Sequence, residues 1–199
     1  MEEQIILACT KDGKFSGRYV PKIKAHQGRG TTHLAIAVLL FNSKGEVLLQ
    51  KRKHQIFDNL WDLTGATHPL HLKNGVDETF KEAALRCLKR EYGITQKVNL
   101  QNLGAFNYFA RDNKQKRIRG RETDDTHFSK YKNGLCENEY CYLLIGEYNG
   151  KLSLNSEIGY QYKWVDKGEF LKDISQNPQN YTPWAKEAIK ILQKTGFLR

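Results

Sequence analysis

The 199-residue sequence lacks any apolar run long enough to cross a membrane, and its start lacks the basic and then apolar pattern of a secretory signal. Its four cysteines have none of the paired spacings of a zinc site, so we expect free thiols in a reducing compartment. Repeats, low-complexity tracts and proline-rich linkers are also missing. These absences predict a single domain over residues 1–199, located in the cytoplasm and without a membrane partner.

Acidic residues are scarce relative to basic ones. The chain has 22 Asp and Glu against 32 Lys and Arg, which gives a net charge of +10. This sign suits an anionic partner such as a diphosphate, a nucleotide or a nucleic acid. The excess is concentrated in a basic insertion at about residues 111–134, where eight Lys and Arg stand against four Asp and Glu. We interpret this insertion as a solvated loop or as a flap that faces phosphate groups or RNA, which leaves nucleic acid open as a partner.

Strand and helix patterns alternate along the chain. The segments that predict strands are residues 4–9, 33–42 and 46–52 (the last two as a hairpin), and stretches near 98–109, 137–148 and 160–165. Apolar residues at helical spacing predict helices over residues 77–92 and about 183–194. The first helix has a capping-box pair, Thr79 and Glu82, near its start and Gly93 after its end. The predicted fold class is therefore α/β or α+β.

Three histidines and two glutamates are candidate metal ligands, and we refer to them together as the His/Glu cage: His26, His33, His68, Glu137 and Glu139. Imidazole nitrogens and carboxylate oxygens both bind divalent cations. Glu137 and Glu139 are two residues apart, so on a strand they point to the same face. His26 lies in a loop that approaches the strand opened by His33. Spacing alone leaves two readings open: a metal site, or structural histidines beside a solvated strand face.

A series of motifs follows one order along almost the whole chain. They are Lys22-Ile23-Lys24-Ala25-His26, His33-Leu34-Ala35, Leu40-Phe41-Asn42-Ser43-Lys44-Gly45, Trp61 with His68-Pro69, Gly75, Glu91-Tyr92-Gly93-Ile94, Phe106-Asn107-Tyr108, Glu137-Asn138-Glu139-Tyr140-Cys141, Trp164 and Thr182-Pro183-Trp184. In this combination the chain resembles the type 1 isopentenyl-diphosphate delta-isomerases, a branch of the Nudix superfamily. The resemblance implies a Nudix fold, with a mixed β-sheet sandwiched between helices, and a small-molecule diphosphate as substrate.

The resemblance also implies metal ligands. In these isomerases the counterparts of the whole His/Glu cage hold a divalent metal. Glu91 matches a helix glutamate that helps to bind a magnesium ion on the substrate diphosphate. We therefore expect Mg²⁺ or Mn²⁺ as the cofactor, with Zn²⁺ as the alternative in the His/Glu cage.

Five residues match groups that act on the substrate. Glu139 matches the catalytic glutamate and Tyr108 the tyrosine beside it, so we expect both to be catalytic. Lys22 and Arg52 match basic residues near the diphosphate. Trp184 matches an aromatic residue that stabilises a carbocation by its π face, and we expect it to bind substrate together with Lys22 and Arg52.

Ala66 occupies the position of the catalytic cysteine in this family. Isomerisation adds one proton and removes another, and the resemblance assigns these steps to the cysteine and to Glu139. The hydroxyls of Thr64 and Thr67 are too weakly acidic to replace a thiol easily. Since loss of a positioned acid or base costs about 10²–10⁴-fold in rate, we do not expect efficient isomerisation by the usual route.

The hydrolytic Nudix motif is degraded as well. Counting back from Gly93, Arg90 and Cys87 stand where that motif has glutamates, and Glu91 is retained. A helix with this pattern has too few carboxylates for a site with two or three magnesium ions.

Three functions stay open from the sequence. The favoured one is a metal-dependent Nudix-family enzyme that acts on a diphosphate, as a hydrolase of an isoprenyl or nucleoside diphosphate derivative. The second is an isomerase with altered acid–base chemistry, in which water or Thr67 replaces the thiol. The third is a non-catalytic Nudix protein that binds a nucleotide or RNA.

Overall fold

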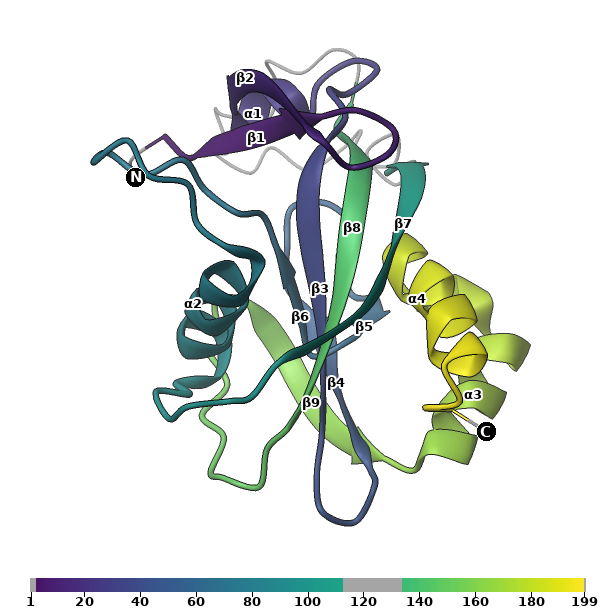
Figure 1. Cartoon of the computed structure of the whole chain (residues 1–199). Helices are drawn as coiled ribbons and strands as arrows, with labels where there is room; N and C mark the ends of the chain where they lie inside the picture. Colours follow the sequence, from purple (N-terminus) through teal and green to yellow (C-terminus); the bar gives the residue numbers. More distant parts are fainter. Residues whose placement is uncertain (1–2, 113–133, 199) are drawn as a thin grey trace, which may run out of the picture.

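The computed structural model describes residues 3–112 and 134–198, and Figure 1 shows their arrangement. The strands are β1 (Ile5–Cys9), β2 (Phe15–Pro21), β3 (His33–Phe41), β4 (Val47–Arg52), β5 (Trp61–Asp62), β6 (Gly65–Thr67), β7 (Gln101–Arg111), β8 (Cys136–Glu147) and β9 (Gly159–Val165). The helices are α1 (Lys22–Ala25), α2 (Phe80–Tyr92), α3 (Lys167–Gln176) and α4 (Pro183–Lys194), with a 3₁₀ turn at Pro178–Asn180. Within the described ranges, no helix is both long and apolar enough to cross a membrane.

Most of the basic insertion, residues 113–133, lies outside the described residues. The interpretation of this segment as a flap that faces phosphate groups or RNA therefore stays a prediction.

Strand β3 is the centre of a mixed sheet. Its apolar run is buried from His33 to Leu40, as a central strand requires. β8 pairs with it in parallel, from His33 opposite Glu139 to Phe41 opposite Glu147. β7 extends the sheet beyond β8 in the antiparallel direction, and β9 pairs antiparallel with β4.

Helices cover both faces of this sheet, α2 on one side and α3 with α4 on the other (Figure 1). Ile36 and Val38 of β3 pack in the core beneath α2. Ala35 and Ala37, which alternate with them, pack in the core beneath α3 and α4. The alternation follows from the pleat of the strand. A mixed sheet between helices confirms the predicted α+β fold class.

The ends of α2 follow the sequence signals. Thr79 Oγ1 accepts a hydrogen bond from the Glu82 amide, and the Glu82 carboxylate accepts one from the Thr79 amide. Gly93 ends the helix in the left-handed region at φ 66°, where glycine has no steric penalty. The predicted capping box and glycine stop are therefore confirmed.

The predicted hairpin of residues 33–42 with 46–52 is only partly present. Phe41 pairs with Val47, but β6 pairs with β3 from Ile36 to Val38, and β4 pairs mainly with β9. The sequence pattern also does not predict α1, α3, β2, β5 and β6. Some of these elements are short, and β2 is mostly exposed. Helix α3 buries only Phe170 and Ile174. The hydrophobic periodicity of all five is therefore weak.

Candidate metal site and substrate pocket

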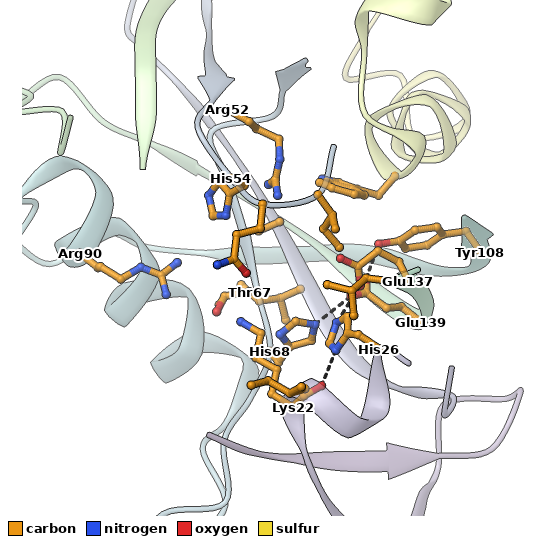
Figure 2. Close-up of a pocket in the computed structure, with 17 residues that line it drawn as sticks. Lys22, His26, Arg52, His54, Thr67, His68, Arg90, Tyr108, Glu137 and Glu139 are labelled. Atoms are coloured by element: carbon orange, nitrogen blue, oxygen red, sulfur yellow. Dashed lines mark hydrogen bonds and ion pairs between the residues drawn. The ribbon is translucent and has the colours of Figure 1, made fainter. Parts of the chain in front are cut away.

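The structure brings the whole His/Glu cage together. His26 follows α1, His33 opens β3, His68 follows β6, and Glu137 and Glu139 lie on β8. One ligand atom of each residue lies within 4.8 Å of the others, and all five side chains are buried. Figure 2 shows four of them pointing toward one another. Strand β8 supplies the same-face glutamate pair that the spacing predicts.

Backbone carbonyl groups orient two of the imidazoles. His26 Nδ1 lies 2.6 Å from the Lys22 carbonyl oxygen, and His33 Nδ1 lies 2.7 Å from that of Thr31. A carbonyl oxygen only accepts, so each Nδ1 carries the proton. The Nε2 lone pairs of both rings are therefore directed into the cage, as in metal-binding histidines.

The two carboxylates face these nitrogens. Glu137 Oε2 lies 2.9 Å from His26 Nε2. Glu139 Oε1 lies 2.9 Å from His68 Nε2 and 3.5 Å from His33 Nε2. The hydroxyl of Tyr108 donates to the other Glu139 oxygen, which fixes the rotation of the carboxylate.

This donor arrangement fits a divalent cation. His33 Nε2 and Glu137 Oε2 are buried and have no hydrogen-bond partner in the described part of the chain. Buried lone pairs that face one another are costly unless a positive charge lies between them. Three imidazole nitrogens with two carboxylate oxygens suit Zn²⁺ or Mn²⁺ better than Mg²⁺, which prefers oxygen ligands.

The protonation of the cage is set by burial and by its carboxylates. Burial, assisted by the positive charge of Lys22, lowers the pKa of His68 well below its usual value, so this ring is neutral. Burial also lowers the pKa of His26, but the adjacent Glu137 carboxylate outweighs it and the pKa ends above its usual value. Burial raises the pKa of Glu139, but its contacts with His33 and Tyr108 outweigh this, so its pKa is lowered and it is ionised at neutral pH.

The cage opens into a cavity of about 210 Å³. Figure 2 shows its lining, with Tyr108 and Arg90 toward opposite ends of the view. Ala66 lines the cavity together with Glu139 and Thr67. A methyl group therefore stands where the family resemblance places a catalytic thiol.

None of the four cysteines lines this cavity, and all four lie in the described part of the chain. Cys87 approaches Ala66 from α2, with its Sγ 3.9 Å from the Ala66 carbonyl oxygen. Its side chain is fully buried and directed to Glu91, and burial raises its pKa well above the usual value. Cys87 therefore does not replace the missing acid.

Arg52 and Trp184 line the cavity in a buried cluster with Asp62. Arg52 Nη1 lies 2.9 Å from Asp62 Oδ2, and the guanidinium carbon lies 4.7 Å from the centroid of the Trp184 ring. Trp184 Nε1 donates to Asp62 Oδ1 at 2.6 Å. The charge of Arg52 is thus neutralised by Asp62, and a face of the Trp184 ring already holds a cation.

Glu91 lies apart from the cage. It is 2% exposed, does not line the cavity, and is not among the five converging ligands. Its Oε1 accepts from Arg90 Nη2 at 2.6 Å, and its Oε2 accepts from Gln50 Nε2 at 3.0 Å. The structure therefore does not bring this expected magnesium ligand together with the His/Glu cage.

Three basic side chains line the cavity, and one of them, Arg52, is paired with Asp62. The other two are Lys22 and Arg90, and His54 also lines the cavity. Burial, and then the charges of Arg52, Arg90 and Lys22, lower the pKa of His54 to about 3, so this histidine is neutral. Such a surface suits an anionic group of the substrate.

Sequence reasoning missed two residues that line the cavity, His54 and Arg90. It also missed Gln50, which holds Glu91, and Asp62, which holds two lining residues. Asp62 follows Trp61, which is part of the family resemblance, but its partner Arg52 is on another strand. Arg90 was visible as a departure from the Nudix motif. The positive charge of Arg90, in addition to the loss of a carboxylate at this position, was the sequence signal that could have identified it as a pocket residue.

Comparison with known proteins identifies relatives over most of the chain. A family model described as "NUDIX domain" matches residues 31–185. The chain is 34% identical over 173 residues to the isopentenyl-diphosphate Delta-isomerase of Halorhodospira halophila, covering 85% of this chain and 84% of the relative. It is 29% identical over 186 residues to isopentenyl-diphosphate Delta-isomerase 2 of Aromatoleum aromaticum, covering 92% and 83%.

A solved structure supports the fold independently. The protein DR0079 from Deinococcus radiodurans superposes with a TM-score of 0.58 at 14% identity, covering 88% of this chain and 90% of that one. At this identity the similarity concerns the arrangement of strands and helices alone.

Proposed function

This chain belongs to the Nudix family, and we propose that it is a metal-dependent hydrolase of an isoprenyl or nucleoside diphosphate derivative. One observation carries the proposal. The His/Glu cage, whose buried lone pairs suit a cation, opens into a cavity that Lys22 and Arg90 also line, and Ala66 stands in it where the family resemblance places a catalytic thiol.

In this proposal the residues of the cage and those of the cavity wall have different roles. A divalent cation bound there would act as a Lewis acid and lower the pKa of a water molecule. Glu139, ionised and held by Tyr108, is placed to accept a proton at the edge of the cavity. Lys22 and Arg90, on the cavity wall, are placed to bind the phosphate oxygens. In hydrolysis the water oxygen bonds to phosphorus, a phosphorus–oxygen bond breaks, and the leaving oxygen takes up a proton.

Two features favour hydrolysis over isomerisation. Ala66 cannot donate a proton, and among the described cavity residues no thiol takes its place. One π face of Trp184, the residue that the family resemblance assigns to a carbocation, is in contact with the Arg52 guanidinium at 4.7 Å, so a carbocation at this ring would lie close to a fixed positive charge. A carbocation next to a guanidinium would be destabilised by like-charge repulsion.

The second candidate is an isomerase with altered acid–base chemistry. It is supported by the names of the relatives, which are isopentenyl-diphosphate isomerases, and by the complete set of cage residues. In this case water or Thr67, whose side chain lines the cavity, supplies the proton. The third reading, binding of nucleotide or RNA without catalysis, depends on the basic insertion.

The deciding experiment measures phosphate and diphosphate release from a panel of isoprenyl and nucleoside diphosphates, with Mg²⁺, Mn²⁺ or Zn²⁺. The same reactions are checked for isomerisation of isopentenyl diphosphate. We expect release that Glu139→Gln abolishes and that Glu147→Gln, at an exposed position on the same strand, leaves intact. Formation of the isomer without release would support the second candidate instead. Absence of both reactions across the panel would remove the hydrolase proposal.

A further inference from the structure

Glu91 occupies its expected position in the Nudix motif, but both of its carboxylate oxygens are engaged by neighbouring side chains. Arg90 Nη2 at 2.6 Å and Cys87 Sγ at 3.2 Å lie against Oε1, and Gln50 Nε2 at 3.0 Å lies against Oε2. A carboxylate offers about four lone-pair sites, so these three contacts use most of them. The charge of the carboxylate is already offset by a guanidinium.

The space beside Glu91 is also closed. A Cβ added at Gly65 would lie 3.1 Å from Glu91 Oε2 and 3.0 Å from Cys87 Sγ, so strand β6 packs directly on this carboxylate. Mg²⁺ needs near-octahedral oxygen coordination and usually retains several waters. One enclosed carboxylate with a thiol and an arginine as neighbours does not fit that ion.

Arg90 has donors to spare. Its Nη2 donates to Glu91, while its Nε has no hydrogen-bond partner in the described ranges. Its side chain is 34% exposed and lines the cavity. Arg86, one turn earlier on α2, differs because its guanidinium is held by Glu78 and by the His68 carbonyl oxygen.

Resting on the proposed function, we propose that the Arg90 guanidinium takes the place beside Glu91 that the family resemblance gives to a magnesium ion, and that it binds the diphosphate of the substrate directly. Glu91 then acts as a positioning residue that orients Arg90, and the His/Glu cage is the one metal site in the described part of the chain. The planar fork of arginine matches two phosphate oxygens, which is why arginine suits this task. Lys22, which also lines the cavity, adds a second basic side chain.

The test measures binding rather than turnover, with methylenediphosphonate as a non-hydrolysable probe. Calorimetry gives its affinity in the presence of Mn²⁺, and the electron paramagnetic resonance signal of free Mn²⁺ gives the number of ions bound. We expect a single Mn²⁺ per chain with the probe bound. We expect Arg90→Gln to weaken the probe about tenfold to a hundredfold, the usual range for one charged hydrogen-bonded contact. Lys89→Gln, at the exposed neighbouring position, should bind like wild type.

The direction in which Glu91→Gln changes the affinity for the probe shows whether Glu91 is a magnesium ligand or a residue that positions Arg90. If Glu91 holds a magnesium, the variant binds the probe more weakly, and the proposal is wrong. If Arg90 is the anchor, the variant binds at least as tightly, because the glutamine amide oxygen can still accept from Arg90 and keep it oriented, while the charge of Arg90 is no longer offset. Two Mn²⁺ ions per wild-type chain, or an unchanged affinity in a folded Arg90→Gln variant, would also overturn it. These readouts need no reaction, so a protein without hydrolase activity still tests this inference.

Discussion

Arg52 lies over the indole ring of Trp184, with its guanidinium carbon 4.7 Å from the ring centroid. Asp62 holds both residues by accepting from Arg52 Nη1 and from Trp184 Nε1. The aromatic residue that the sequence resemblance assigns to a carbocation therefore serves here as a support for a fixed cation. Ala66, which stands where the family resemblance places a catalytic thiol, lines the same cavity as this pair.

Restoring the thiol alone should not restore isomerisation. We expect Ala66→Cys to raise conversion of isopentenyl diphosphate less than tenfold, whereas a correctly placed acid contributes about 10²–10⁴-fold. The reason is that the Trp184 face remains in contact with Arg52. The measurement follows isomer formation by NMR, with Ala66→Ser as a control of similar size. A gain of a hundredfold or more would support the isomerase reading.

Loss of Asp62 should destabilise the fold. Asn at this position leaves the buried Arg52 guanidinium without its charge partner, and breaking a buried ion pair from one side costs about 3–5 kcal/mol. Urea unfolding gives the free energy of unfolding for Asp62→Asn and for Glu157→Gln, a control at an exposed position. A loss below 1 kcal/mol for Asp62→Asn would mean that the pair contributes little to stability.

Metal should stabilise the protein through the cage. At a metal concentration of about a hundred times Kd the gain is about 2.7 kcal/mol, or roughly 5–10 °C in Tm for a chain of this size. We expect Zn²⁺ or Mn²⁺ to produce this shift in protein treated with a chelator, and His68→Ala to lose it. His71→Ala is the matched control, because His71 pairs with Asp77 outside the cage. An equal shift in both variants would place the metal elsewhere.

His54 should make stability depend on pH. Its pKa falls to about 3 in the folded protein, first through burial and then through Arg52, whereas an unfolded histidine titrates near 6.5. The unfolded chain therefore binds more protons between these values, so the stability due to His54 is complete above about pH 6.5 and declines as the pH falls toward 3. Unfolding free energies at pH 7 and pH 5 should differ less in His54→Gln than in wild type. An identical difference in the two proteins would contradict the assignment.

Local sequence signals predicted several elements well. The apolar stripe of residues 183–194 coincides with α4, Pro183–Lys194, and the cap residues of α2 have their expected roles. The Glu-x-Glu spacing placed both carboxylates on one face of β8. Each of these features depends on neighbours in sequence, where helical and strand periodicity act.

Pairings between distant segments were not accessible in the same way. The contact of Arg52 with Trp184 joins β4 to α4, and no spacing in the sequence records it. Arg90 beside Glu91 was available from the sequence, but its meaning depends on Gln50 and on the close approach of Gly65, which only the fold defines. The predicted roles of Lys22 and Tyr108 in substrate binding and catalysis stay predictions.

The parallel pairing of β3 with β8 makes the cage sensitive to strand register. His33 lies directly opposite Glu139, although 105 residues separate them along the chain. A slip by one residue would turn Glu139 to the opposite face of the sheet, and a slip by two would carry it about 7 Å along the strand. Either error separates the imidazole from its carboxylate. Metal uptake would therefore report that the central strands have paired correctly, and it should be a late event in folding because such long-range contacts form slowly.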